Sequence, residues 1–456
     1  MATPSLTGMP LELLVHLIAT YLPTKDLGAL RLTNKYLEKA LFDTFAKEFF
    51  TKKQFMLTTP SLQALVGISR HGALKKAMKH CIIGLESYKD TQNWLPPNAD
   101  ASWKLAFHRG LADQFALMSS GRGRDLLAEA FRNLPNLETL GIRDYNAQGR
   151  ARDDNRWSSY GAPTVFQETL CALRCGSGDW ASEVFLLVTQ ALAEANRAIP
   201  SVETILRGVS KGLTDIAFFL PSPNDKMDLV LNGLQQLLLT LNYADRRGTN
   251  VFNDFTLLEG FLLRASSLHH LRLNFVKSDS SWASDVIQRL SSVPNLLPNL
   301  RRLDLGMLLV GPDTLIHVIS KFSATLRHAS LWKVVLMHDA TPQWKDSERR
   351  YSPWPRVLRT LATTTQLSGL SVGCLEQLGE TPQTTSTPIQ IHFSDGKISQ
   401  EYTGGIKIWL PELLDKLVVA WPQYPMTHDS NSDDDDEEMV DEDEDDEEDE
   451  DSYDDE

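Results

Sequence analysis

The segment Leu297-Pro298-Asn299-Leu300-Arg301-Arg302-Leu303-Asp304-Leu305 carries the pattern that decides the fold. Its leucines follow the form L-x-x-L-x-L, and the last two alternate with a polar residue, as in a short strand with one buried face. The preceding Pro-Asn pair is typical of a turn. The segment therefore predicts a turn followed by a short β-strand.

The same pattern recurs along the body of the chain. Copies lie at Leu137–Ile142, Val202–Leu206, Leu234–Leu239, Leu268–Leu273 and Leu367–Val372, and Leu326–Leu331 has Ala329 at its middle position. From residue 202 onward the copies start 26 to 41 residues apart. Apolar residues at helical spacing in Ala181–Ala195 and Thr314–Phe322 predict helices between the strands. A recurring strand-helix unit indicates a repeat architecture.

These segments resemble the leucine-rich repeat. The resemblance implies parallel strands that line a concave face, with long helical connectors behind them. Most steps exceed the common repeat length of about 20–29 residues, so we expect an irregular α/β solenoid over residues 56–428. Leu65–Tyr88 is expected to hold its first strand unit. A hairpin with an Asp-Gly turn at Ile391–Ile398 and a helix at Pro411–Trp421 are expected to close its far end.

The first fifty residues predict three helices. The first begins at Pro10 and ends before Pro23, the second is expected to be capped by Thr24, and the third runs from Asn34, as its N-cap, to about Phe50. The apolar stripe of the first helix is wider than a small helical unit needs for its own packing. A unit of this size and surface is typical of a module that binds a partner.

Residues 8–50 resemble the F-box in Met9-Pro10-Leu11-Glu12, Leu17-Ile18, Tyr21-Leu22-Pro23, Asp26-Leu27 and Leu30-Arg31-Leu32-Thr33-Asn34-Lys35. The resemblance implies a helical module, placed at residues 1–55, that docks a Skp-type adaptor and joins the chain to a cullin-RING ubiquitin ligase core. It assigns the apolar docking surface or its support to Pro10, Leu11, Leu14, Leu17, Ile18, Leu22, Leu27 and Leu30. The alternative is a helical start to the fold in which these residues form an internal core.

The strand segments from residue 268 onward have a basic exposed face. Its residues are His269, His270, Arg272, Arg301, Arg302 and Arg327. Because guanidinium groups pair well with phosphates and carboxylates, this face is a candidate cradle for an acidic or phosphorylated protein substrate. A solvated face, or a dock for the chain's own acidic tail, explains the same residues.

Charge separates the body from the C-terminal tail. The 456 residues carry a formal charge of −15, yet residues 429–456 hold 21 acidic residues among 28, which leaves the rest at about +6. Such dense like charge predicts a disordered tail. The tail is a candidate ligand for basic proteins such as histones or for the solenoid itself, and a solubilising role without a partner is the alternative.

Several classes of function are disfavoured. No apolar run reaches the roughly 18 residues of a membrane helix, so we expect a cytoplasmic or nuclear protein. The four cysteines lack metal-ligand spacing, no cofactor motif is present, and the modest body charge argues against nucleic acid. Gly208-Val209-Ser210-Lys211-Gly212 satisfies the G-x-S-x-G pattern of hydrolases, but no Gly-rich oxyanion segment precedes it.

These observations favour a non-enzymatic substrate receptor of an SCF-type ubiquitin ligase. The helical module would bind the adaptor, and the solenoid would bind the protein substrate. The alternative is an acidic-tailed leucine-rich-repeat scaffold or chaperone that binds basic proteins.

Overall fold

The computed structural model describes residues 6–15, 21–91, 100–146, 158–208, 212–220, 225–242, 255–276, 282–337, 352–378 and 388–421. The compact unit that holds these elements spans residues 1–420. The acidic tail expected at residues 429–456 lies outside the described residues.

The N-terminal segment folds into short helices with a small core of their own. These are η1 Leu6–Gly8, α1 Leu11–Leu13, α2 Thr24–Thr33 and α3 Lys35–Phe50. The Asn34 side chain accepts a hydrogen bond from the Tyr36 N–H at 2.7 Å, so the cap expected for the third helix is confirmed. The cap expected at Thr24 is wrong, because Pro23 occupies that position and Thr24 is the first helical residue.

A long sheet follows, and the strands of its first part are all parallel. In spatial order this part consists of β1 Lys52–Phe55, β2 His80–Gly84, β4 Thr139–Arg143, β6 Ser201–Ile205, β7 Gln236–Leu241, β8 His270–Phe275, β9 Arg302–Val310 and β10 His328–Leu336. The strand expected near Cys81 is β2. The additional strand β1 precedes it, within the segment assigned above to the helical module.

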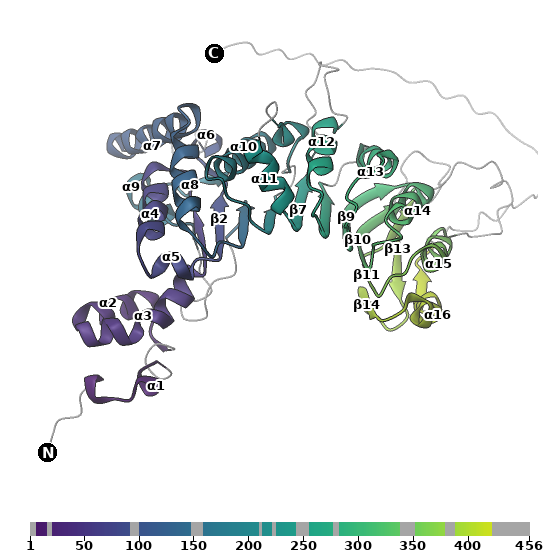
Figure 1. Ribbon diagram of the computed structural model, residues 1–456, viewed down its shortest axis with the longest axis horizontal. Coiled ribbons are helices and arrows are strands. Elements are labelled where there is room, and N and C mark those ends of the chain that lie inside the picture. Colours follow the sequence, from purple (N-terminus) through teal and green to yellow (C-terminus); the bar gives the residue numbers. More distant parts are fainter. Residues whose placement is uncertain are drawn as a thin grey trace, which may run out of the picture. The chain divides into compact units, whose positions relative to one another are not determined.

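Helices connect successive strands and pack beside one another in chain order. Figure 1 shows them on one side of the strands. They are α4 Thr59–Arg70, α8 Arg122–Asn133, α10 Gly178–Glu194, α11 Asp225–Gly233, α12 Thr256–Arg264, α13 Trp282–Ser292, α14 Pro312–Lys321 and α15 Trp354–Thr364. The helices expected at 181–195 and 314–322 are thus confirmed as α10 and α14. Parallel strands alternating with helices give the mixed α/β, leucine-rich-repeat-like arrangement.

Further elements accompany the N-terminal half of the sheet. They are α5 Leu74–Ala77, β3 Glu86–Ser87, α6 Tyr88–Thr91, α7 Ala101–Ser119, α9 Ala162–Thr169, β5 Arg174–Cys175 and η5 Asp215–Phe218. Strands β3 and β5 form a separate antiparallel pair. Helix α3 packs against α5 and β1, and these contacts join the helical module to the sheet.

The repeated leucines build one continuous core between sheet and helices. In the copy at residue 300, Leu300, Leu303 and Leu305 are each at most 3% exposed, and the equivalent leucines at 268, 271 and 273 are at most 1% exposed. Strands β4 and β7 to β11 each begin two residues after the first leucine of their copy, so this leucine fills the core from the turn. Strand β6 differs, because it begins at Ser201, one residue before its copy. The strand segments predicted from L-x-x-L-x-L are confirmed as β4, β6, β7, β8, β9, β10 and β11.

Three neighbouring strands break at the same lateral position. Met307, Lys333 and Cys374 have positive φ angles of 54°, 53° and 49°. Strand pairing skips them, because Trp332 pairs with Gly306 and Gly373 while Val334 pairs with Leu308. Each left-handed residue kinks its strand and shifts the inward alternation by one, and the one-to-one register between the strands is kept because all three strands share the kink. Leu303 and Leu305 before the break and Leu308 and Val310 after it therefore all reach the core.

The same break divides the last parallel strand into β11 Gly369–Gly373 and β12 Glu376–Leu378. Each half has its own antiparallel partner: β14 Ser399–Thr403 pairs with β11, and β13 Pro388–Phe393 pairs with β12. The hairpin expected around Asp395-Gly396 is therefore wrong, because its two strands pair elsewhere although the turn is present. Strand β15 Leu417–Val419 pairs with β13.

The closing helix begins earlier than expected. Helix α16 spans Ile406–Lys416, with Pro411 inside it, and β15 takes the residues expected to continue the helix. Ile406, Trp409 and Leu413 face the core from α16. A proline within a helix removes one backbone donor, and packing of this apolar face outweighs that local cost.

Because the backbone at Lys333 is left-handed, we expect glycine at this position to give a more stable protein than alanine. Because a side chain at positive φ costs roughly 1–2 kcal/mol, we expect Lys333→Gly to be more stable than Lys333→Ala by about 1 kcal/mol in urea unfolding. At the exposed Lys39 within α3, the same comparison should have the opposite sign, because glycine is about 1 kcal/mol worse than alanine in a helix. A lower stability of Lys333→Gly than of Lys333→Ala would contradict the prediction.

Candidate functional site

The structure divides the predicted adaptor-binding residues into buried and exposed groups. Leu14 and Leu27 are 0% and 1% exposed and belong to the core of the helical module, with Leu22 and Leu30 packed against it. Pro10 and Leu11 are exposed. Leu17 and Ile18 lie outside the described residues. The buried leucines thus support the module, and the exposed residues are available to a partner.

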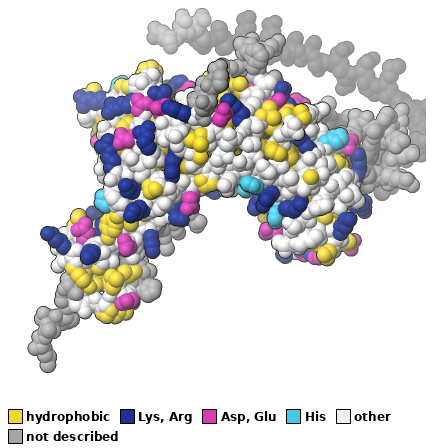
Figure 2. All heavy atoms as spheres, in the orientation of Figure 1, with side chains coloured by type: hydrophobic (Ala, Val, Ile, Leu, Met, Phe, Trp, Pro, Cys, Tyr) yellow, Lys and Arg dark blue, Asp and Glu magenta, His cyan; other side chains and the backbone are white. Residues whose placement is uncertain are grey.

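Further apolar side chains of the module are exposed that the sequence analysis did not single out. They are Leu6, Leu13, Tyr21, Leu32 and Tyr36, of which Leu32 is 87% and Tyr21 78% exposed. Figure 2 shows hydrophobic side chains gathered over this part of the molecule. Single exposed leucines are ordinary, but here several apolar side chains are exposed on one small module. Leu32 was detectable from sequence, since it lies off the helix stripe that contains Leu27.

The cation Arg31 strengthens the module and is not part of this apolar surface. Its guanidinium lies 3.8 Å from the centroid of the Phe45 ring, and the Phe42 ring is 5.4 Å away. This cation–π contact links α2 to α3. Burial lowers the pKa of Arg31, opposed by the charge of Glu38.

The predicted basic set falls into two rows. His270 and Arg302 begin strands β8 and β9 and pair laterally, and Arg272 lies two residues along β8, beside Asp304. His269, Arg301 and Arg327 precede the strands instead. Backbone hydrogen bonds connect these three residues. Arg301 N–H donates to His269 C=O and Arg327 N–H donates to Arg301 C=O, both at 2.8 Å. The residues predicted to form one cradle therefore lie partly on the strands and partly in the turns that precede them.

On the open face, a chain of hydrogen bonds crosses four strands. The Gln236 amide lies 3.0 Å from His270 Nδ1, and His270 Nε2 lies 2.8 Å from Asp304 Oδ2. Arg302 Nε donates to Asp304 Oδ1 at 2.9 Å, and Ser201 extends the chain to Gln236. Burial raises the pKa of Asp304, but hydrogen bonds from His270 and Arg302 outweigh it and lower the pKa overall. Asp304, the polar residue that alternates with Leu303 and Leu305, is therefore a buried counter-charge.

A second polar cluster lies nearer the N-terminal strands. Glu203 on β6 reaches across β4, and its Oε1 lies 3.1 Å from His80 Nε2 and 2.5 Å from a terminal nitrogen of Arg143. Gly141 on β4 makes this possible, because a Cβ there would lie 3.1 Å from His80 Nε2 and 3.2 Å from Glu203 Oε1. Burial opposes ionisation of Glu203, yet the contacts with His80 and Arg143 lower its pKa to about 2.

Internal pairing reduces the charge that the open face offers to a partner. His270 and Arg302 share Asp304, and Arg143 is held by Glu203. The side chains that stay exposed on this part of the sheet include Arg302, His328 and Trp332. The open face is therefore a mixed polar and aromatic surface, less basic than the sequence suggested.

The hydrolase motif cannot be assembled from the described residues, because Val209, Ser210 and Lys211 lie outside them. Its flanking glycines have structural roles. Gly208 N–H donates to Asp144 Oδ2 at 2.7 Å, and the Gly212 backbone packs closely on Gly178 and Leu241.

Within the described ranges, no group of three His, Cys, Asp or Glu side chains is arranged to hold a metal ion. None of the helices described is both long and apolar enough to cross a bilayer.

Comparison with known proteins adds little. No protein-family model matches the sequence, and no curated protein matches it. Among solved structures, the leucine-rich repeat-containing protein LegL7 from Legionella pneumophila is similar, with 15% sequence identity and a TM-score of 0.26, over 80% of this chain and 98% of that one. At this low similarity, the leucine-rich-repeat-like assignment rests on the strand topology of the chain itself.

The charge cluster at Glu203 predicts a pH-dependent contribution to stability. Because the pKa of Glu203 falls from 4.5 to about 2 on folding, its contribution is complete above about pH 5 and decreases as the pH falls below about 4.5. We expect Glu203→Gln to lower the free energy of unfolding by about 2 kcal/mol at pH 7, since it leaves Arg143 buried without a counter-charge. Denaturant unfolding at pH 7, 5 and 4 measures this difference.

The exposed pair of Lys79 and Glu138, joined at 2.9 Å, provides the control. Glu138→Gln should change stability by less than about 0.5 kcal/mol at each pH, because exposed ion pairs contribute little. An effect of Glu203→Gln equal to that of Glu138→Gln would contradict the assigned role.

Proposed function

We propose that the chain is a non-catalytic substrate receptor of a cullin-RING ubiquitin ligase, with residues 8–50 docking a Skp-type adaptor. The observation that carries this proposal is the exposed apolar surface of the helical module. The module keeps Leu14, Leu27, Leu37, Leu41 and Phe49 in its own core. It still exposes Leu11, Leu13, Tyr21 and Leu32 to solvent. An apolar surface that is not needed for folding suits a partner protein.

The sheet then serves as the surface for the protein substrate. The open face presents side chains from many strands in a row, and repeat proteins commonly bind ligands on such a surface. His328, Trp332 and Arg302 are its exposed aromatic and basic groups. Such a receptor forms no bond itself, and it raises the effective concentration of substrate near the ligase core.

A second candidate function rests on the composition of the last 28 residues, 21 of which are acidic. An acidic-tailed scaffold of this kind would bind basic proteins, such as histones, without needing an adaptor. The two functions differ in what they require of the helical module, so one experiment on that module separates them.

The test is co-purification of the full chain with a recombinant Skp-type adaptor. The wild-type chain should capture the adaptor stoichiometrically. The double variant Leu13→Asp, Leu32→Asp should lose at least tenfold in affinity, because a charge in an apolar interface removes its desolvated contacts. Both positions are exposed, so the melting temperature should change little. Leu14→Asp is unsuitable, because Leu14 lies in the core of the module.

The matched control is Phe115→Asp, Ile408→Asp, which places the same charges at 72% and 83% exposed apolar positions on α7 and α16. This variant should keep full capture. Capture retained by the Leu13→Asp, Leu32→Asp variant would refute docking through this surface. A wild-type chain that captures no adaptor would favour the acidic-tailed scaffold.

A further inference from the structure

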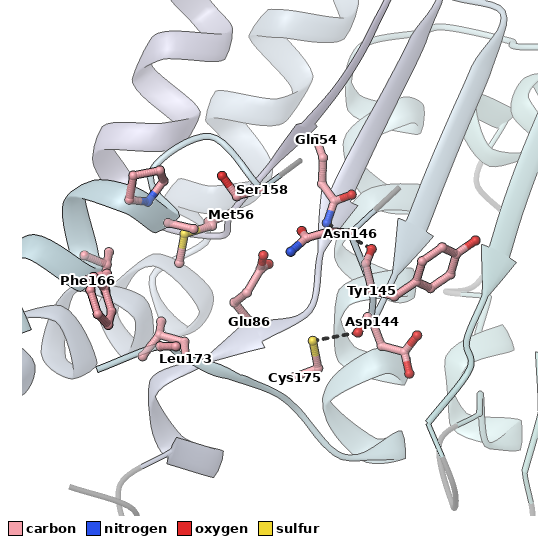
Figure 3. A pocket seen from close by; sticks show the side chains of 14 residues that line it. Gln54, Met56, Glu86, Asp144, Tyr145, Asn146, Ser158, Phe166, Leu173 and Cys175 are labelled. Carbon is pink, nitrogen blue, oxygen red and sulfur yellow. Dashed lines mark hydrogen bonds between the residues drawn. The ribbon is translucent and has the colours of Figure 1, made fainter. Parts of the chain in front are cut away.

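A cavity of about 340 Å³ lies at the carboxyl ends of β1, β2 and β4. Figure 3 shows the Glu86 side chain pointing into it, between Met56 and Asn146. Gln54 and Met56 enter from the end of β1, Asp144 and Tyr145 follow β4, and Phe166 contributes from α9. In sheets of parallel strands, this end of the strands is where ligands commonly bind.

Hydrogen bonds fix the orientation of the polar groups in this cavity. The Gln54 amide nitrogen donates to Ser159 Oγ at 2.9 Å, and Ser159 Oγ in turn donates to Glu86 Oε1. A serine hydroxyl has one proton, and Glu86 receives it. Gln54 must therefore turn its nitrogen toward Ser159, which leaves its oxygen directed elsewhere.

Two buried acceptors consequently have no donor among the described residues. They are Glu86 Oε2 and Gln54 Oε1. The two residues are 8% and 1% exposed, and both line the cavity. Unpaired buried polar atoms are rare in folded proteins. Burial also raises the pKa of Glu86, although the Ser159 hydroxyl and the backbone N–H of Glu86 itself oppose that shift.

The local backbone is shaped around this carboxylate. A Cβ atom on Gly84 would collide with Glu86 Oε2 and with Ser159 Oγ. Glycine at residue 84 thus makes room for an acid that gains no ion pair within the described chain. A group that folding alone would disfavour indicates a ligand site.

The charge of the cavity wall selects the kind of ligand. Asp144 is a second acid in the wall, and neither lysine nor arginine is among the described residues that line the cavity. The carboxylate of Asp144 is partly occupied, because it accepts hydrogen bonds from the backbone N–H groups of Arg207 and Gly208. Met56, Val165, Phe166 and Leu173 supply apolar walls. Two free acceptors, net negative charge and apolar walls suit a cation on an alkyl stem.

We propose that this cavity binds a guanidinium or primary ammonium group carried on an alkyl stem, with Glu86 as its charged partner and Gln54 Oε1 as its second acceptor. Such a group belongs to an arginine or lysine side chain of a bound protein, or to a free alkylamine. The cavity is separate from the surface of the helical module, so this assignment does not depend on adaptor binding.

Isothermal titration calorimetry of the full chain tests the ligand class. The probes are the capped peptide acetyl-Gly-Arg-Gly-amide, its lysine counterpart, and the free amine agmatine. Acetyl-Gly-citrulline-Gly-amide is the neutral control, because citrulline keeps the shape of arginine without its charge. We expect the cationic probes to bind at least tenfold more tightly than the citrulline peptide. Tighter binding of the peptides identifies a protein side chain as the ligand, and tighter binding of agmatine identifies a free amine.

Two matched variants test the site. Glu86→Gln should lose at least tenfold in affinity for the cationic probes while its melting temperature at pH 7.5 rises by a few degrees. The rise is expected because the raised pKa of Glu86 makes its ionised form unfavourable in the folded chain, and the gain should shrink as the pH falls toward 4.5. Glu168→Gln removes the same charge from the exposed face of α9, beside the cavity, and should leave affinity unchanged.

Four results would overturn the proposal. They are equal binding of the arginine and citrulline peptides, unchanged affinity in folded Glu86→Gln, no binding of any probe at millimolar concentration, and binding that appears only in an Arg150→Gln, Arg152→Gln, Arg156→Gln variant. In the last case the cavity would bind arginine side chains of the same chain. None of these measurements uses the adaptor, so a failure here is distinct from a failure of the proposed ligase function.

Discussion

The fold depends on the lateral register of its parallel strands. Gln236, His270, Arg302 and His328 begin four successive strands and pair with one another across the sheet. This register places leucine beside leucine on the helix side, which makes one core from many short repeats. It also places polar side chains in rows on the open side. A shift of one residue in any strand would exchange the two faces.

The rows on the open side show how a repeat surface neutralises its own charge. Asp304 is bonded to His270 and Arg302, and Glu203 is paired with His80 and Arg143. Each acid is buried by neighbouring strands, so each needs its cation close by. The open face of the sheet is therefore polar and ordered, and only some of its cationic side chains are accessible to a partner. Selectivity on this face would depend on shape and aromatic contacts as well as on charge.

The helical module and the cavity at Glu86 share one physical feature. Both keep groups in an environment that folding alone does not favour. The module exposes Leu32 and Tyr21 to water, and the cavity holds a carboxylate oxygen and an amide oxygen without a described donor. Proteins commonly retain exposed apolar side chains or unpaired buried polar atoms where a partner or ligand supplies the missing contact. The two sites lie on separate elements, which allows each to act by itself.

The sequence by itself determined the strands β4 and β6 to β11 and the helices α10 and α14, because a buried leucine pattern depends on local periodicity alone. Asn34 as a helix cap was predictable because a cap depends on a hydrogen bond between residues close in the sequence. Tertiary structure alone decided that Leu14 is core while its neighbour Leu13 is exposed, since periodicity reports an apolar face and not what covers it. The left-handed kinks at Met307, Lys333 and Cys374 and the burial of Asp304 and Glu203 could not be predicted from the sequence either. Each depends on residues from neighbouring strands, as does the cavity formed by Gln54, Glu86 and Ser159, which only lateral pairing brings together.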